Sequence, residues 1–379
     1  MHLDQPIILD SGSSSTKVGF KSDSIPVDVF QTVIGYTEDL SSLRHSDLLI
    51  YDLEYYIGER ALSSKRVKKL LYPVWNLVID WESIEKLWHY AFFDRLHVNP
   101  NYNPIMVVES FYSTRGQQEK IAEIMFEVFC VPQLLLSKSP LLCLYAAGKT
   151  TGVIVESSAS ITIVVPIYKG TIIRHAITYS SIGGYSITKY LQKMLGNKYA
   201  QLKRQKFSHL IDELKKKHCY VSLNAEREKK VFMKTKKFNK EFILPSGDIG
   251  IMEEERFRAP ELLFDPLLNG HNDEPIQNLI LESIKKCDLT IRKELLDNLI
   301  LCGGNTLLHG FRERLDKELN LLFEEKLGFK IKSFENREFF PWIGGRILCE
   351  YAEKTDLWLS RKKYLETGID SAPFLSYFL

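Results

Sequence analysis

The alternation of apolar and polar residues predicts a β-hairpin in two similar places. The first hairpin has an apolar strand at 6–10 that ends in Asp10, a serine-rich turn, and a returning strand at 17–20. The second repeats this shape over 153–165, and its first strand ends in Glu156. Because each hairpin opens about half of the chain, the pair predicts a duplicated α/β lobe with a cleft between the copies.

Helical spacing of apolar residues predicts helices after both hairpins. One apolar face covers 84–92 with Asp80 as a suitable N-cap, and another covers 121–129 and stops before Pro132. A third run over 295–300 predicts a helix, and the pair of glycines that follows it fits the exit of either a helix or a strand. Strands that alternate with such helices imply a mainly parallel sheet.

Composition places the chain among ordinary globular proteins. Its 379 residues are 45% hydrophobic, enough for two domains or one large bilobed domain. A net charge of +2 argues against general affinity for nucleic acid. The six cysteines form no CxxC pair, which disfavours a zinc site or disulfide framework and predicts a reducing compartment. No secretory leader and no membrane span are expected.

One segment departs from this balance of charge. Residues 203–240 contain thirteen lysines and arginines against four acidic residues. The segment is either a solvated helical face or a docking surface for an acidic partner or nucleic acid. No aromatic stacking pattern beside it favours nucleic acid.

The hairpins suggest a phosphate site. Backbone N–H groups and serine hydroxyls in such a turn can donate hydrogen bonds to phosphate oxygens. A carboxylate at the strand end can orient a hydrated magnesium ion, and the positive charge of Lys17 can pair with the negative phosphate. A single Gly/Ser hairpin is a weak signal. Two of them, together with the later run Gly303-Gly304-Asn305-Thr306, are a stronger one.

The chain resembles the actin family along nearly its whole length. The first hairpin reads LDSGSSSTKVGF and the glycine-rich run reads LCGGNTLLHGF. The matching blocks follow in the family's order and cover 9–20, 79–96, 119–132, 144–157, 165–177, 218–223, 255–266, 286–295, 301–311 and 341–348.

The resemblance implies the actin fold, a duplicated bilobed α/β architecture of the actin, Hsp70 and sugar-kinase type with four subdomains and nucleotide in a central cleft. Subdomain 1 is expected at 1–33, 72–146 and 340–379, and subdomain 2 at 34–71. Subdomain 3 is expected at 147–182 and 275–339, and subdomain 4 at 183–274.

The resemblance also implies a site for ATP with magnesium, but this chain's departures from the family predict weak residual binding and no firmly assigned cofactor. Residues at nucleotide-binding positions are Asp10, Gly12, Ser13, Ser14, Lys17, Gly184, Lys215, Gly303, Gly304, Asn305 and Thr306, although Ser14 stands where glycine is usual. The second hairpin departs further, because the family has an acidic residue, Ser, Gly, Asp and Gly where this chain has 156–160 as Glu-Ser-Ser-Ala-Ser. Side chains at two glycine positions are expected to crowd the phosphates.

The residues that serve hydrolysis in the family are replaced as well. Ser139 stands at the position of the glutamine that holds the attacking water, and Ile163 at that of the assisting histidine. On the adenine side, Lys216 replaces a glutamate and Glu338 a lysine. These changes together predict a chain with no catalytic residues and no ATPase activity.

Of three surfaces that the actin family uses for assembly, this chain retains one and differs from the family at the other two. A groove that takes an amphipathic helix in the family is lined here by Tyr145, Ala146, Gly148, Thr150, Leu348, Tyr351 and Leu357, which could equally be ordinary core residues. The family's apolar plug falls at 268–275, where this chain is polar and charged. The subdomain 2 loop at 37–52 does not resemble that of the family.

We therefore expect an actin-like structural or scaffolding subunit of a cytoskeletal assembly, in the cytoplasm. Its partners would be proteins, among them other actin-family subunits, bound through the groove and the basic 203–240 segment. Membranes are not expected as partners, and nucleic acid is disfavoured. The alternatives are a nuclear actin-related subunit of a chromatin-remodelling complex and an ATP-binding actin that forms filaments.

Overall fold

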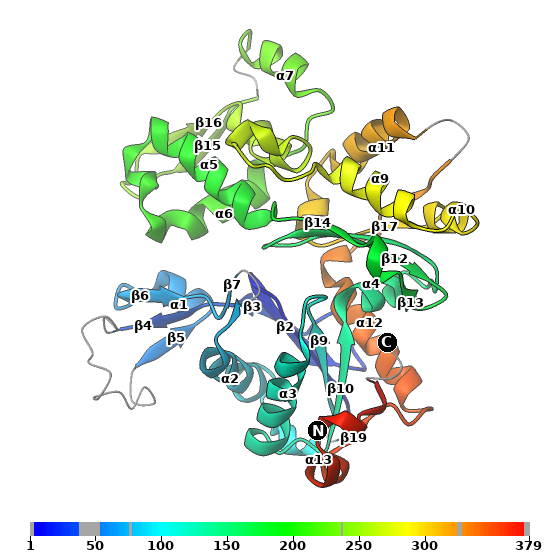
Figure 1. Ribbon diagram of the computed structural model, residues 1–379. Coiled ribbons are helices and arrows are strands. Elements are labelled where there is room, and N and C mark those ends of the chain that lie inside the picture. Colours follow the sequence, from blue (N-terminus) through cyan, green and yellow to red (C-terminus); the bar gives the residue numbers. More distant parts are fainter. Residues whose placement is uncertain (1–3, 38–53, 76–77, 236–237, 324–327, 375–379) are drawn as a thin grey trace. The chain divides into compact units, whose positions relative to one another are not determined.

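The computed structural model describes residues 4–37, 54–75, 78–235, 238–323 and 328–374 (Figure 1). The chain divides into two compact units with separate hydrophobic cores. Unit 1 is Met1–Gly148 with Phe339–Leu379, and unit 2 is Lys149–Glu338. The finer division into four subdomains stays a prediction. The loop expected at 37–52 lies, apart from Thr37, outside the described residues.

Unit 1 is built on a mixed sheet with strand order β19-β10-β9-β1-β2-β3. Strands β1, β9 and β10 are parallel, and the others are antiparallel to their neighbours. The continuous apolar run that begins β1 is fully buried, as expected for a strand covered on both faces. The strands are β1 (Ile7–Ser11), β2 (Ser15–Phe20), β3 (Asp28–Gln31), β9 (Ile105–Glu109), β10 (Gln133–Lys138) and β19 (Leu359–Ser360).

The helices predicted in this unit are confirmed, with π-helical extensions. Asp80 accepts a hydrogen bond from the Ser83 N–H and caps α2 (Trp81–His89), which continues as a π-helix over Tyr90–Arg95. Thr114 caps α3 (Arg115–Glu123), followed by a second π-helix over Ile124–Val128. The remaining elements are α1 (Glu59–Ser63), α4 (Ser139–Ala146), α12 (Phe340–Ala352), α13 (Arg361–Thr367) and the short strands β4 (Ile34–Tyr36), β5 (Tyr55–Ile57), β6 (Lys69–Leu71), β7 (Val74–Trp75) and β8 (Val78–Ile79).

A close helix crossing joins the two parts of the chain that form unit 1. Helix α12 packs against α4 and against strands β1 and β9. A Cβ atom at Gly344 would lie 1.9 Å from the carbonyl oxygen of Leu142, so only glycine allows this approach. The Trp342 indole also donates to the carbonyl oxygen of Ile8, at 3.0 Å.

Unit 2 repeats the hairpin and the mixed sheet. Its sheet order is β13-β12-β11-β17-β18, with β14 also paired to β12. Strands β11, β17 and β18 are parallel, whereas the hairpin β11–β12 is antiparallel. The strands are β11 (Gly152–Ser157), β12 (Thr162–Tyr168), β13 (Thr171–Ile172), β14 (Thr178–Ser180), β17 (Leu299–Cys302) and β18 (Ile331–Lys332).

Two predictions about this architecture were wrong. The run at 295–300 is not one helix, because α10 (Arg292–Leu296) ends and Leu299 begins β17, which lies buried between β11 and β18. Short apolar runs fit either structure by periodicity. Both sheets are also mixed rather than mainly parallel, because a hairpin turn is too short for a crossover and forces its strands to be antiparallel.

The other elements of unit 2 form two groups. In Figure 1, α9 (Ile276–Lys286), α10 and α11 (Phe311–Leu322) lie on one side, and α9 packs against β12 and β14. The second group is α5 (Gly184–Lys198), α6 (Ser208–His218), α7 (Ala225–Phe232), α8 (Glu255–Arg258) and the two-stranded hairpin β15 (Lys240–Ile243) and β16 (Ile249–Met252). Within the described ranges, no helix is both long and apolar enough to cross a membrane.

Candidate functional site

The first hairpin holds its charged residues as an ion pair. Asp10 and Lys17 face each other across β1 and β2, and Lys17 Nζ lies 3.0 Å from Asp10 Oδ2. Both side chains are largely buried. The carboxylate expected to orient magnesium and the ammonium expected to meet phosphate therefore compensate each other's charge.

The turn between these strands is tied to its neighbours by hydrogen bonds. The Gly12 N–H donates to the Ser15 carbonyl oxygen at 3.1 Å, and the Thr32 N–H donates to the Ser14 carbonyl oxygen at 3.0 Å. The indole of Trp88 donates to Ser11 Oγ, also at 3.0 Å. These bonds fix the backbone of the loop that the sequence assigns to phosphate.

A second pair of charged residues lies at the ends of the neighbouring parallel strands. Glu109 ends β9 and accepts hydrogen bonds from Ser113 and Gln118, and Lys138 ends β10 with its Nζ 3.6 Å from Glu109 Oε1. Burial raises the pKa of Glu109, while Lys138 and the hydrogen bonds oppose that shift. This ion pair is the second one at the C-terminal ends of the parallel strands of the sheet.

The second hairpin is closed by a hydroxyl network. Ser157 is fully buried, and its Oγ lies 2.8 Å from Thr162 Oγ1, which donates in turn to the Ile182 carbonyl oxygen. Ser158 directs both its N–H and its hydroxyl to the Ile161 carbonyl oxygen, at 2.9 and 3.1 Å. The donors that could have met a phosphate at Ser158 are used within the turn.

The glycine-rich run Gly303-Gly304-Asn305-Thr306 packs onto this hairpin. The Asn305 amide donates to Ser157 Oγ at 3.1 Å and to the Ser158 carbonyl oxygen at 2.7 Å. Gly303 has φ +86°, and a Cβ there would lie 2.3 Å from the Ser157 carbonyl oxygen, so glycine is required on both counts. Arg337 then holds Thr306 through its Oγ1 and its carbonyl oxygen.

Lys215 is held in the same unit by three acceptors. Its Nζ donates to the Gly184 carbonyl oxygen, Thr188 Oγ1 and Asp212 Oδ1, at 3.0, 2.9 and 2.6 Å. An ammonium has three N–H donors, so this set occupies all of them. Burial alone would raise the pKa of Asp212, but Lys215 and Lys216 outweigh it and hold that pKa well below its usual range.

The fold agrees with a comparison against protein families. Residues 2–372 match the family model described as Actin. The chain belongs to the actin family. The residues predicted to bind nucleotide fall into two groups, one in each unit.

The residues at the family's hydrolytic and adenine positions lie on ordered elements. Ser139 is buried at the start of α4, and Ile163 is 2% exposed in β12, opposite Glu156. Lys216 is half exposed and pairs with Asp212 at 2.7 Å. Glu338 follows Arg337 in a 3₁₀ turn.

The predicted groove residues differ in accessibility. Leu348 and Leu357 are 3% and 4% exposed and belong to the core of unit 1, and Tyr145 packs against that core. Tyr351 is 44% exposed and is the accessible aromatic of this set. Ala146 is half-buried, Gly148 and Thr150 are exposed, and Thr150 belongs to unit 2. The groove itself stays a prediction.

The sequence reasoning missed Asp212 and Arg337. Asp212 stands three and four residues before Lys215 and Lys216 in α6, and this spacing on a helix is a recognisable signal for ion pairs. Arg337 gives no such signal, because it lies thirty-one residues from Thr306 along the chain. Tertiary packing alone brings these two together.

The pairing of Asp212 predicts a pH-dependent stability. We expect Asp212→Asn to lower the free energy of unfolding by about 3 kcal/mol at neutral pH, since it leaves the buried Lys215 ammonium without its carboxylate. The folded-state pKa of Asp212 is lowered, so its contribution is present above the unfolded pKa and is lost as the pH falls below about 4. Urea unfolding at several pH values measures both effects.

Lys216→Ala is the matched control, since it removes the half-exposed partner of the same carboxylate. It should cost less than about 1 kcal/mol. An Asp212→Asn defect that stays the same size from neutral to strongly acidic pH would contradict this assignment.

Proposed function

We propose that this actin-family chain is a structural or scaffolding subunit of a cytoskeletal assembly and does not turn over ATP. The observation that carries the proposal is the closed second hairpin. Its serine hydroxyls and the Asn305 amide bond to one another and to backbone rather than pointing outward as a set of free donors. A loop that cradles phosphate needs its donors available to the ligand.

The state of Lys215 supports the same conclusion. In the family this position contacts the nucleotide base, but here the ammonium has three acceptors within the protein. Moving it toward a ligand would leave the Asp212 carboxylate paired with Lys216 alone. The residues present therefore suit a weak nucleotide site at best.

Absence of turnover is the first expected result. Purified protein should release phosphate from ATP with magnesium no faster than a protein-free blank, because Ser139 is too short to hold a water and Ile163 cannot form a hydrogen bond. The double variant Ser139→Gln with Ile163→His should remain inactive, since the second hairpin is unchanged. Turnover by the unmodified protein, measured as phosphate release, would refute the proposal.

The segment at the position of the family's apolar plug, 268–275, is hydrogen-bonded to the rest of unit 2. Asp273 accepts hydrogen bonds from the Ser181 N–H at 2.5 Å, from Ser181 Oγ at 2.9 Å and from Ser180 Oγ at 3.1 Å. Lys193 donates to Asn269 at 3.0 Å. A polar segment held down by such bonds is poorly suited to insertion between subunits of a filament, since its charges would be buried unpaired.

The second expected result is that the protein alone remains monomeric in salt that polymerises actin. Sedimentation velocity would show a single slow species, and electron microscopy would show no regular filaments. Regular homopolymers would instead favour the alternative of an ATP-binding actin that forms filaments.

The predicted groove is our candidate for binding a partner helix. Because Leu348 is buried, the informative variant is Tyr351→Asp, which places a charge on the accessible aromatic. It should weaken capture of co-purifying partner proteins by tenfold or more, on the order of a lost central anchor. Glu353→Gln is the control, since Glu353 pairs with Lys21 at a partly exposed position and should change capture by less than about threefold.

The rival surface is the basic segment. If Lys217→Glu releases the partners and Tyr351→Asp does not, the groove assignment is wrong. We place the protein in the cytoplasm, in a cytoskeletal structure, and keep the nuclear chromatin-remodelling subunit as the alternative. Imaging of the tagged chain separates these two compartments.

A further inference from the structure

The hairpin β15–β16 forms a sheet of only two strands, and its two outer edges differ. At the β16 edge, the Tyr199 hydroxyl accepts from the Ile251 N–H at 2.8 Å and donates to the Ile251 carbonyl oxygen at 3.3 Å. Ile251 therefore turns its backbone groups away from β15. Its partner in the register is Glu241, so Glu241 must turn its own groups away from β16.

The same alternation applies at Ile243. Leu244 donates its N–H to the Asp248 carbonyl oxygen, so the pair of residues next to it, Ile243 and Ile249, is a non-hydrogen-bonded pair. The N–H and C=O groups of Glu241 and Ile243 thus point outward along β15. Within the described part of the chain, the structure gives these groups no hydrogen-bond partner.

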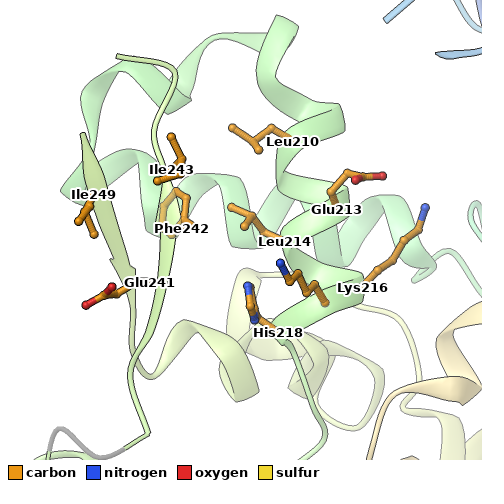
Figure 2. Close-up of a pocket in the computed structure, with 10 residues that line it drawn as sticks. Leu210, Glu213, Leu214, Lys216, His218, Glu241, Phe242, Ile243 and Ile249 are labelled. Carbon is orange, nitrogen blue, oxygen red and sulfur yellow. The ribbon is translucent and has the colours of Figure 1, made fainter. Parts of the chain in front are cut away.

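A pocket of about 670 Å³ lies beside this open edge, within the usual range for ligand sites of about 300–1,000 Å³. Figure 2 shows Leu210 and Leu214 extending from α6 toward Phe242 of β15. Leu214 and Phe242 are buried, and Leu210 is half-buried. The pocket therefore offers apolar contacts next to unpaired backbone groups.

The charges around the pocket favour an acidic occupant. Lys215 and Lys216 share the single carboxylate of Asp212, so these three side chains carry one excess positive charge. Lys217 and Lys240 have no carboxylate within ion-pair distance among the described residues, and Glu213 and Glu241 are the opposing acids. The pKa of His218 is lowered by its burial and then by three neighbouring cations, which are Lys217, Arg256 and Lys240.

We propose that the β15 edge and the pocket between β15 and α6 bind an extended, acidic segment of a partner protein as a third strand of this sheet. Backbone hydrogen bonds to Glu241 and Ile243 would hold the segment, one apolar side chain would fill the pocket, and its carboxylates would meet Lys217 and Lys240. Lys216, which stands at an adenine-side position and is paired with Asp212, is the one predicted nucleotide-site residue that lines this pocket, and no predicted groove residue lines it. The inference goes beyond the scaffold role and does not depend on it.

The test uses the full chain and a defined probe. The probe is a fluorescent, end-capped peptide of about six residues in which valine or isoleucine alternates with glutamate, a length typical of a strand. Binding is followed by fluorescence anisotropy. Matched peptides carry lysine in place of glutamate, or N-methyl groups on alternate amides. We expect the acidic peptide to bind about tenfold more tightly than either of the other two.

Proline substitutions locate the site on one edge. Ile243→Pro removes an N–H that β16 does not use, and it should weaken binding of the acidic peptide by about tenfold. Ile249→Pro removes the corresponding N–H on the opposite edge, and because the Ile249 side chain also lines the pocket, it is compared with Ile249→Thr, which keeps the N–H. These two variants should bind the peptide within about threefold of each other. Ile243→Thr, which keeps the N–H at this exposed position, should also retain most of the binding. Circular dichroism melting checks that each variant is folded.

Amide hydrogen exchange gives an independent result. Bound peptide should protect the amides of Glu241 and Ile243 and leave that of Ile249 unchanged. Equal binding by the lysine peptide or the N-methyl peptide, or equal loss in the two proline variants, would overturn the proposal. So would failure of the acidic peptide to bind, or a dimer of this chain that Ile243→Pro abolishes, which would assign the edge to a second copy.

Discussion

The buried hydroxyl of Ser157 is the contact on which the packing of the second hairpin, in unit 2, depends. It joins Thr162 on the returning strand to Asn305, which lies 148 residues later in the chain. Since Gly303 meets the Ser157 carbonyl oxygen at a distance that excludes any Cβ, the hairpin and the glycine-rich run form one packed body. Loss of a buried hydroxyl from such a network costs more than loss of an exposed one, because its partners remain buried without a bond.

This packing explains how an actin-family chain can keep its fold although the turn of its second hairpin lacks the family's usual glycines and aspartate. In the family, glycine and aspartate in that turn are expected to contact the ligand. Here the Ser158 hydroxyl instead donates to the backbone of the same turn and stabilises the protein. Asp212 acts in a similar way on Lys215. In both places the groups at predicted nucleotide positions form bonds within unit 2, which is the physical basis of the proposed scaffold role.

The sequence predicted the parts of the fold that depend on local pattern. Both hairpins and the Asp80 cap are confirmed, because alternation and capping are short-range signals. The helix predicted over 295–300 failed because four buried residues, Leu299 to Cys302, suit a strand as well as a helix. The Ser157–Asn305 and Arg337–Thr306 contacts join distant segments, so no local pattern could indicate them. The burial of Leu348 likewise depends on how α12 packs against α4.

The nucleotide content of the protein purified under native conditions tests the central claim most directly. Extraction followed by chromatography would quantify adenine nucleotide per chain. The account predicts far less than one nucleotide per chain, since three or four lost charge-assisted hydrogen bonds, each worth about 1.5–3 kcal/mol, would weaken a tight site by several decades. Close to one ATP or ADP per chain, retained through gentle purification, would contradict it.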